Sequence, residues 1–329
     1  MKLLIAFSML LFAWIAAAAP AKNSDHDQSK DTKELIKRSK EIYHGNHDIV
    51  SILLPLNGLN LNTDSSKPST NLTIFFVEAD IDNDGERTYK GLYVFKEGKA
   101  TKILENGKDA AASADNSKQI FFAAEDGIYE YNYNANEAVK YGSVTDNIIG
   151  IAKTNSSDEI YILTQDHELY KVTNKGNTKT KVEEVFNAQE IVLDYSNNIY
   201  FYAEDKKPYV LTATGLKNIE GLPANPTDVK LIKPPFVIQD GVILILDNAV
   251  YIIYANGSKI HHNDIKEPDV KLTAWAIEAF LIDYFAYDKK IYEFNLLENI
   301  LDDIFKQFGN WLEEKICSTF TCHEETKHN

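Results

Sequence analysis

Short runs of β-branched and aromatic residues, each ending in an aspartate, recur through the chain at a near-constant spacing. The aspartates are Asp80, Asp126, Asp166, Asp205, Asp247 and Asp288, which lie 46, 40, 39, 42 and 41 residues apart. A period of about 40 to 45 residues built from such runs is typical of a propeller blade of four antiparallel strands. A helical solenoid of the same period would need amphipathic runs, and residues 70 to 295 contain none. The sequence therefore predicts an all-β fold, a six-bladed β-propeller.

Each blade also needs an inner strand ahead of its aromatic run. The segments that fit are Leu59–Asn62, Ala110–Ala112, Ile148–Ile151, Ile191–Leu193, Val229–Ile232 and Ala274–Ile277. The sixth blade has no candidate for a fourth strand after Asn295. The apolar run Ile49–Leu54, which precedes the first copy, is predicted to supply that strand and so to close the ring and cover two exposed edges. The propeller is accordingly expected to span residues 48–295.

The two ends of the chain differ from this pattern. Residues 1–19 have a basic start, a short apolar run and small residues before Pro20, which is typical of a cleaved secretory signal peptide. Residues 20–47 are polar and are predicted to be a flexible leader. In 296–329, apolar residues recur every three or four positions, which predicts an amphipathic helix followed by a tail with two cysteines. Its polar face is acidic, so we expect it to pack across one mouth of the ring rather than on a membrane.

Charge and cysteine content limit the possible partners. The formal net charge is −15, which argues against binding to nucleic acid or to an anionic membrane. Cys317 and Cys322 are too few for a Cys-based zinc or iron–sulfur site. In a secreted protein they are expected to pair with each other, although intermolecular disulfides remain an alternative. The glycosylation sequons at Asn71, Asn155 and Asn256 agree with secretion.

Catalytic patterns are weak. The recurring aspartates are expected to bond their own turn backbone rather than to form a ring of ligands. Residues 80–85 match the first half of a calcium loop, but Gly91 stands where its last acidic ligand belongs, so an acidic hairpin is favoured. Glu190, Asn147 and Asp228 lie near the places where six-bladed hydrolases hold an axial metal. No Gly-x-Ser-x-Gly nucleophile motif is present.

Aromatic residues on the loops that lead into inner strands are the candidates for a ligand site, because such loops meet at one mouth of the ring. Trp275, near the start of the last inner strand, is the first candidate for a flat ligand to stack on. Phe186, Asn187 and Gln189 occupy the equivalent place in another blade. Asn147 offers an amide at the mouth.

Three segments, Asp48-Ile-Val-Ser-Ile-Leu, Leu72-Thr-Ile-Phe-Phe and Asp126-Gly-Ile-Tyr-Glu-Tyr-Asn-Tyr-Asn, resemble the ommochrome-binding proteins of moth haemolymph. More distantly, the chain is similar to six-bladed propellers of the low-density-lipoprotein-receptor and gluconolactonase type. The first resemblance covers roughly residues 48–295. The C-terminal helix and the cysteine pair lie outside it.

The resemblance implies a secreted carrier of a small aromatic pigment of the xanthommatin type, without catalysis and without a cofactor. A pigment that bears anionic groups needs local cations in so acidic a protein, and Lys108 and Lys230 lie near the starts of inner strands. A metal-dependent, lactonase-like hydrolase and a protein-binding extracellular propeller are the alternatives.

Overall fold

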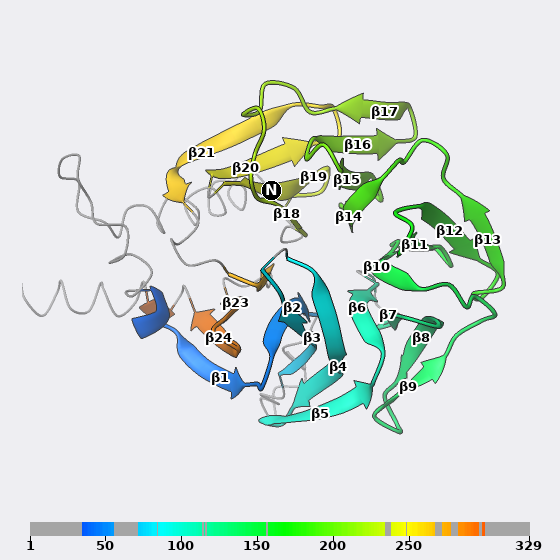
Figure 1. Cartoon of the computed structure of the whole chain (residues 1–329), viewed down its shortest axis with the longest axis vertical. Helices are drawn as coiled ribbons and strands as arrows, with labels where there is room; N and C mark the ends of the chain where they lie inside the picture. Colours follow the sequence, from blue (N-terminus) through cyan, green and yellow to red (C-terminus); the bar gives the residue numbers. More distant parts are fainter. Residues whose placement is uncertain are drawn as a thin grey trace, which may run out of the picture.

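Six four-stranded antiparallel sheets stand in a ring around a common axis in the computed structural model (Figure 1). The structure describes residues 35–55, 72–83, 85–113, 115, 117–155, 157–233, 238–247, 249–266, 272–277, 282–295 and 298–299. Within this part of the chain the fold is all-β, and the prediction of a six-bladed β-propeller is confirmed.

In blades 1 to 5 the strands follow one another along the chain from the axis outward, whereas the outermost strand of blade 6 is β1. Blade 1 comprises β2 (Asp48–Leu53), β3 (Thr73–Ile81), β4 (Arg87–Lys96) and β5 (Lys99–Leu104); blade 2 comprises β6 (Gly107–Ala112), β7 (Ile120–Ala124), β8 (Gly127–Asn132) and β9 (Glu137–Lys140); blade 3 comprises β10 (Ile148–Lys153), β11 (Ile160–Thr164), β12 (Leu169–Thr173) and β13 (Thr178–Lys181). Blade 4 comprises β14 (Ala188–Leu193), β15 (Ile199–Ala203), β16 (Pro208–Thr212) and β17 (Gly215–Asn218); blade 5 comprises β18 (Val229–Ile232), β19 (Gly241–Leu246), β20 (Ala249–Tyr254) and β21 (Lys259–Lys266); blade 6 comprises β22 (Ala274–Ile277), β23 (Ile282–Tyr287), β24 (Lys290–Asn295) and β1 (Lys40–His44).

The repeated aromatic runs form the second strand of each blade, which packs against neighbouring blades on both faces. Every residue of β7 and β19 is buried, so these strands carry continuous apolar runs rather than an alternation. The fourth strands are polar, and all four residues of β13 are exposed. Hydrophobicity therefore falls from the second strand to the rim of each blade.

The ring closes through a different strand from the one expected. β1 pairs antiparallel with β24 and completes blade 6, which Figure 1 shows as a blue strand beside an orange one. β2 pairs with β3 as the inner strand of blade 1. The prediction that Ile49–Leu54 closes the ring was therefore wrong, and the closing strand lies in the range expected to be a flexible leader. The segment Leu59–Asn62, predicted as an inner strand, lies outside the described residues.

A physical difference between inner and outer strands explains this error. Ile49 and Val50 are buried, because an inner strand is covered on both faces. The closing strand β1 pairs with β24 along one edge and is an edge strand on the other side, so polar residues are tolerated in it. Its Ile42 and Tyr43 pack into the core. A short polar edge strand has little apolar pattern that distinguishes it from a leader.

Neighbouring blades are joined by aromatic packing and by one close backbone approach. Phe75 of blade 1 lies 5.4 Å from Phe122 of blade 2, measured between ring centroids. Gly142, which precedes blade 3, has φ of +69°, and a Cβ placed there would come within 2.4 Å of the backbone of Gly176. Only glycine permits this contact, because any side chain would separate the two turns.

Both chain ends of the described region meet beside blade 6. Leu35 and Ile36, at the start of a short helical turn, pack against its core. Arg38 donates hydrogen bonds to the side chain and the carbonyl of Asn299, at 2.9 and 3.3 Å. Residues 298–299 are helical, and Asn295 caps them by accepting from the N–H of Glu298. Most of the predicted helix, and Cys317 and Cys322, lie outside the described residues.

Across the described ranges no helix has the length and the apolar character needed to cross a membrane.

Candidate functional site

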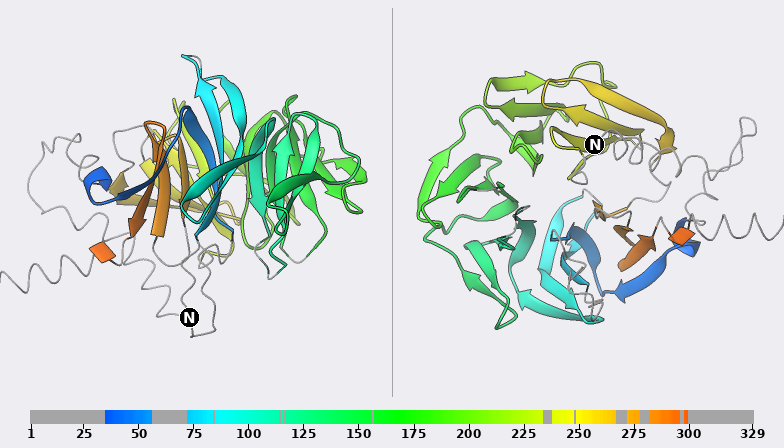
Figure 2. Two further views of the ribbon diagram at one scale, coloured as in Figure 1. Left: turned by 90° about the horizontal axis from the view of Figure 1, so that it is seen from below. Right: turned by 180° about the vertical axis from the view of Figure 1, so that it is seen from behind.

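All six inner strands begin on the same side of the ring, which we call the entrance face. Because each inner strand runs antiparallel to the second strand, its start lies beside the turn that carries the recurring aspartate. Gly107, for example, pairs with Ala124, two residues before Asp126. The entrance face is thus formed by the loops into the inner strands together with the turns between second and third strands. The β3–β4 hairpin, cyan in Figure 2, projects beyond the rest of this face.

The recurring aspartates tie these two sets of loops together. Asp80 Oδ1 lies 2.6 Å from His47 Nδ1, and Asp126 Oδ1 accepts a hydrogen bond of 2.7 Å from Asn106 Nδ2. Asp247 accepts from the N–H and hydroxyl of Thr227 and from the next N–H. In each case the partner directly precedes or begins the inner strand of the same blade.

The expected bond to the turn's own backbone occurs at Asp205, which accepts from the N–H of Lys207. The prediction is therefore confirmed at Asp205, whereas Asp80, Asp126 and Asp247 bond to residues of the loop into the inner strand of their own blade. The Thr227 hydroxyl holds the pKa of Asp247 below its ordinary value, and Lys90 does the same for Asp80.

The β3–β4 hairpin is held by internal contacts. Asp80 pairs with Lys90 at 2.8 Å, and Asp82 accepts from the N–H of Glu86 at 2.9 Å. Asp84 lies outside the described residues. The favoured interpretation as an acidic hairpin agrees with these contacts, since Lys90 already neutralises the first carboxylate.

One level of the channel wall carries the polar side chains of interest. It consists of one residue from each inner strand, whose partner on the second strand precedes the recurring aspartate by three positions, or by two in blade 5. These residues, one from each blade in chain order, are Ser51, Asp109, Gly150, Glu190, Lys230 and Trp275. We call this set the channel ring. The charges of Asp109 and Lys230 both act on Glu190, and Ser51 bonds to Asp109, so the ring brings two carboxyls, an ammonium group and a hydroxyl near one another.

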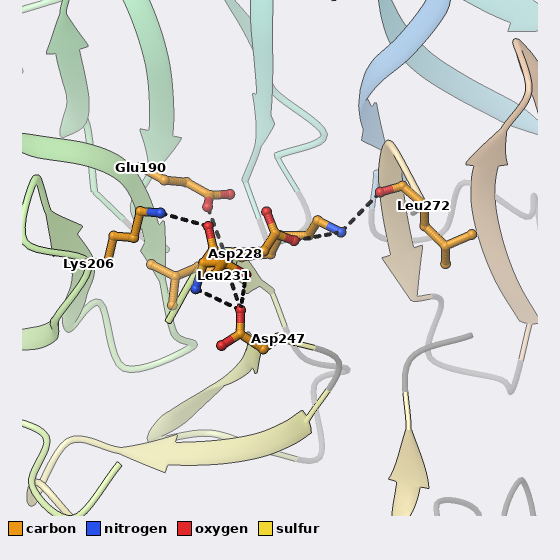
Figure 3. Close-up of polar contacts among 8 residues, drawn as sticks. Glu190, Lys206, Asp228, Leu231, Asp247 and Leu272 are labelled. Carbon is orange, nitrogen blue, oxygen red and sulfur yellow. Dashed lines mark hydrogen bonds and ion pairs between the residues drawn. The ribbon is translucent and has the colours of Figure 1, made fainter. Parts of the chain in front are cut away.

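The two carboxyls of the channel ring hold the next blade in the same way. Asp109 accepts hydrogen bonds from the Ser51 hydroxyl at 2.9 Å and from the N–H of Ile151 at 3.0 Å. Glu190 accepts from the N–H of Leu231 at 3.1 Å, a contact drawn in Figure 3. Each N–H belongs to the residue that follows the channel-ring position of the next blade.

The setting of these carboxyls shifts their titration. Burial raises the pKa of Glu190 to about 7, and the Leu231 N–H and the charge of Arg87 only partly oppose this. Burial likewise raises the pKa of Asp109, opposed by the Ile151 N–H and by Arg87. Arg87, at the start of β4, therefore lies close enough to act on both carboxyls.

Lys108 and Asn147, two of the predicted ligand-binding residues, are brought into contact. Lys108 Nζ donates to Asn147 Oδ1 at 2.6 Å across the boundary between blades 2 and 3. The same ammonium lies 5.2 Å from the centroid of the Tyr89 ring. Burial lowers the pKa of Lys108. All three side chains are partly exposed, so a cation, an amide and an aromatic ring converge on the entrance face.

Lys230 bridges blades 5 and 6. Its ammonium donates to the carbonyl oxygen of Leu272 at 3.1 Å and lies 3.4 Å from Asp228 Oδ2, as Figure 3 shows for Leu272. Its charge also acts on Glu190. The predicted cation is thus in the channel wall, with its charge shared among groups of the protein.

Trp275 is held between two blades rather than presented as an open platform. Its ring packs against the cores of blades 5 and 6, including Ile243 and Phe285. Its Nε1 is buried and has no hydrogen-bond partner among the described residues. The residue is partly exposed. Trp275 lies near the start of the last inner strand, as its sequence position indicated, but the sequence did not reveal this packing.

Phe186 lines a separate cleft of about 410 Å³, together with Asn187, Ala203, Glu204 and Asp205. Its side chain is 44% exposed. Gln189 is not in the lining, and its amide instead donates to the Asn187 carbonyl at 3.1 Å. The predicted residues therefore divide between the channel entrance and this cleft on blade 4.

The three positions proposed for an axial metal are engaged with other groups. Glu190 is bonded to Leu231, Asn147 to Lys108, and Asp228 to Lys230. In the part of the chain that the structure describes, no three His, Cys, Asp or Glu side chains are grouped so that they could hold a metal ion.

The sequons differ in their surroundings. Asn155 is partly buried, and its Nδ2, the atom that would carry a glycan, donates to the Tyr195 carbonyl at 2.8 Å. Asn256 is exposed at the β20–β21 turn, where its Oδ1 accepts from the N–H of Ser258. Asn71 lies outside the described residues.

Sequence reasoning missed Asp109, Arg87, Tyr89 and Glu204. Asp109 could have been found, because it is the one acidic residue of its inner strand and aligns with Glu190. Arg87 and Tyr89 could not, since they belong to a third strand, which the repeat pattern does not place near the axis.

Comparison with known proteins assigns no family to the chain. The sequence matches no known family profile, and no curated protein is similar to it. Similar solved structures include the RRP9 WD40 repeats (TM-score 0.49, 9% identity, 76% of each chain) and U3-55K (0.48, 9%, 76% of this chain and 77% of that one). Another is PorZ of the Porphyromonas gingivalis type-IX secretion system (0.47, 10%, 78% of this chain and 38% of that one). None of these comparisons links the chain to ommochrome-binding proteins, and the β-propeller assignment rests on its own six sheets.

Proposed function

We propose that this protein is a secreted, non-enzymatic carrier that binds a small aromatic pigment of the ommochrome type at the entrance of its channel. The propeller fold is compatible with a carrier or a protein-binding role, and the contents of the entrance favour the first. The observation that carries the proposal is the convergence of Lys108, Asn147 and Tyr89 from three different blade elements.

This arrangement matches the chemistry of a flat, conjugated ligand with polar edges. The tyrosine offers a face for stacking, the amide offers a directional hydrogen bond, and the lysine offers a cation for an anionic group. Arg87 adds positive charge nearby, which offsets the net charge of −15 that would otherwise repel an anionic pigment. Secretion is supported by the signal-like first 19 residues.

The direct test is the absorbance spectrum of the protein isolated from its source, followed by titration of colourless recombinant protein with xanthommatin. Binding is read from quenching of the fluorescence of Trp275 and Trp311, the two tryptophans that follow the expected cleavage site. Lys108→Gln should weaken binding about tenfold, since a charge-assisted contact contributes roughly 1 to 2 kcal/mol. A colourless native protein that xanthommatin does not quench would overturn the proposal.

A matched control separates a local contact from an effect of overall charge. Lys175 is exposed on the turn between β12 and β13, on the opposite side of the ring, so Lys175→Gln removes the same charge elsewhere. Equal loss of affinity in both variants would show that Lys108 does not contact the pigment.

A further inference from the structure

The cleft on blade 4 contains an exposed aromatic ring whose orientation is fixed by its neighbours. Phe186 is held edge-to-face by two rings, those of Phe201 at 5.8 Å and 89° and of Tyr209 at 5.2 Å and 70°. Phe201 is fully buried, and it stacks with Tyr209 at 5.2 Å. These contacts fix the orientation of the Phe186 ring, yet 44% of the side chain remains exposed beside a cleft of about 410 Å³. A fixed, exposed ring at a cavity is pre-organised for a ligand.

Two carboxylates line the same cleft. Glu204 and Asp205 line it next to Phe186. Lys207 contacts Asp205 at 3.0 Å, and burial of Asp205, which alone would raise its pKa, is outweighed by hydrogen bonds from Lys207, so that its pKa is lowered. No ion pair to Glu204 occurs within the described part of the chain, and its side chain is exposed.

Lys206, the remaining cation of this turn, does not supply charge to the cleft lining. Its ammonium donates to the Thr227 carbonyl at 2.6 Å, in the loop into blade 5. The cleft therefore combines an aromatic face with a carboxylate that lacks a counter-ion. This is the combination that recognises organic cations, because the ring quadrupole attracts positive charge and the carboxylate balances it.

We propose that this cleft binds a small organic ammonium compound, with its charge between Phe186 and Glu204 and its hydrocarbon part on the Phe186 ring. The net charge of −15 favours the approach of such a cation. A site for cations on blade 4 is independent of the pigment site at the channel entrance, which needs Lys108, and the protein would then carry two ligands of opposite charge preference.

The test uses the full mature chain and two probes that share a benzyl group, benzyltrimethylammonium and neutral benzyl alcohol, in calorimetric titrations. We expect saturable binding of the cation and at least about tenfold weaker binding of the alcohol. Glu204→Gln should weaken binding of the cation about threefold to tenfold. Glu220→Gln is the matched control, because Glu220 is exposed on the same blade and lies outside the cleft lining.

Two variants of the aromatic residue separate packing from recognition. Phe186→Leu keeps apolar volume against Phe201 and Tyr209 but removes the π face, and it should weaken binding as Phe186→Ala does. A thermal melt checks that each variant is folded; if Phe186→Ala is not, Phe186→Leu and Glu204→Gln decide. The proposal is overturned if benzyl alcohol binds as tightly as the cation, or if these variants change the dissociation constant no more than Glu220→Gln. Lys108→Gln should leave binding of the ammonium probe unchanged, so failure here is distinct from failure of the pigment proposal.

Discussion

Glu190 of blade 4 accepts a hydrogen bond of 3.1 Å from the backbone N–H of Leu231 in blade 5. Asp109 of blade 2 makes the same contact with Ile151 of blade 3. Two carboxyls, two blades apart, thus hold the next inner strand through its backbone. Because each contact joins residues about 40 positions apart, it constrains how one blade sits against the next.

Replacing Asp109 separates the role of its hydrogen bonds from that of its charge. Asp109→Ala leaves the Ile151 N–H without a partner, which should lower the free energy of unfolding by about 1 to 3 kcal/mol. Asp109→Asn keeps an acceptor and removes a buried charge, so its stability at pH 7 should lie within about 1 kcal/mol of the parent. Urea denaturation measures both. Equal stabilities for the alanine and asparagine variants would show that the Ile151 contact is unimportant.

Glu190 should make stability fall as pH rises. Its pKa is raised to about 7 in the folded protein, so between the unfolded value near 4.5 and pH 7 the folded state holds the proton more tightly. The contribution is therefore most favourable below pH 4.5 and is lost by about pH 7. In Glu190→Gln this part of the pH dependence should disappear from denaturation curves recorded at pH 5, 6, 7 and 8. An unchanged profile would contradict the raised pKa.

Asp247 should act in the opposite direction. Hydrogen bonds from Thr227 lower its pKa in the folded protein, so its stabilisation is present above its unfolded value of 3.8 and is lost as pH falls below that value. Asp247→Ala should lower the melting temperature at pH 7 and reduce the difference in stability between pH 5 and pH 3. Thermal melts at these three pH values test this. Thr227→Val, which removes only the hydroxyl donor, should show a smaller effect of the same sign.

Replacing Trp275 should lower the free energy of unfolding more than replacing an exposed aromatic side chain would. Trp275→Ala removes a large side chain from between two blade cores and should cost about 3 to 5 kcal/mol. Trp275→Phe keeps most of the contact and removes the buried, unpartnered Nε1, so it should cost less than about 1.5 kcal/mol. Urea denaturation distinguishes the two. Near-parent stability of Trp275→Ala would show that the indole does not join the blades.

The two described sequons should differ in occupancy. Asn155 uses its Nδ2 to hold the Tyr195 carbonyl of the next blade, so a glycan there would remove this contact, whereas Asn256 is exposed in a turn. If the protein is secreted as proposed, we expect a glycan at Asn256 and none at Asn155. Mass spectrometry of glycopeptides tests this directly. The loss of mass in Asn256→Gln, with no loss in Asn155→Gln, would agree with it.

Five inner strands could be predicted from the sequence because each lies a few residues ahead of an aromatic run. Part of the candidate site could be predicted in the same way: Lys108, Asn147 and Lys230 all precede or begin inner strands, and the ring geometry brings such positions to one face. Their partners could not be predicted, since Tyr89 belongs to an outer strand of another blade. The sequence also did not show that Phe186 lines the cleft on blade 4 whereas Gln189, three residues later, bonds to the Asn187 carbonyl instead.

The sequence by itself determined the number of blades and the order of the strands in blades 2 to 5, because the periodic alternation of apolar runs and turn residues is a local property. Only the tertiary structure decided that Lys40–His44 closes the ring and that Asp109 and Glu190 hold the blades that follow them. These features depend on contacts between residues that are about 40 to 250 positions apart. Such contacts form when the sheets twist and pack around the axis. A short polar strand or a single carboxylate has no local sequence pattern from which they could be predicted.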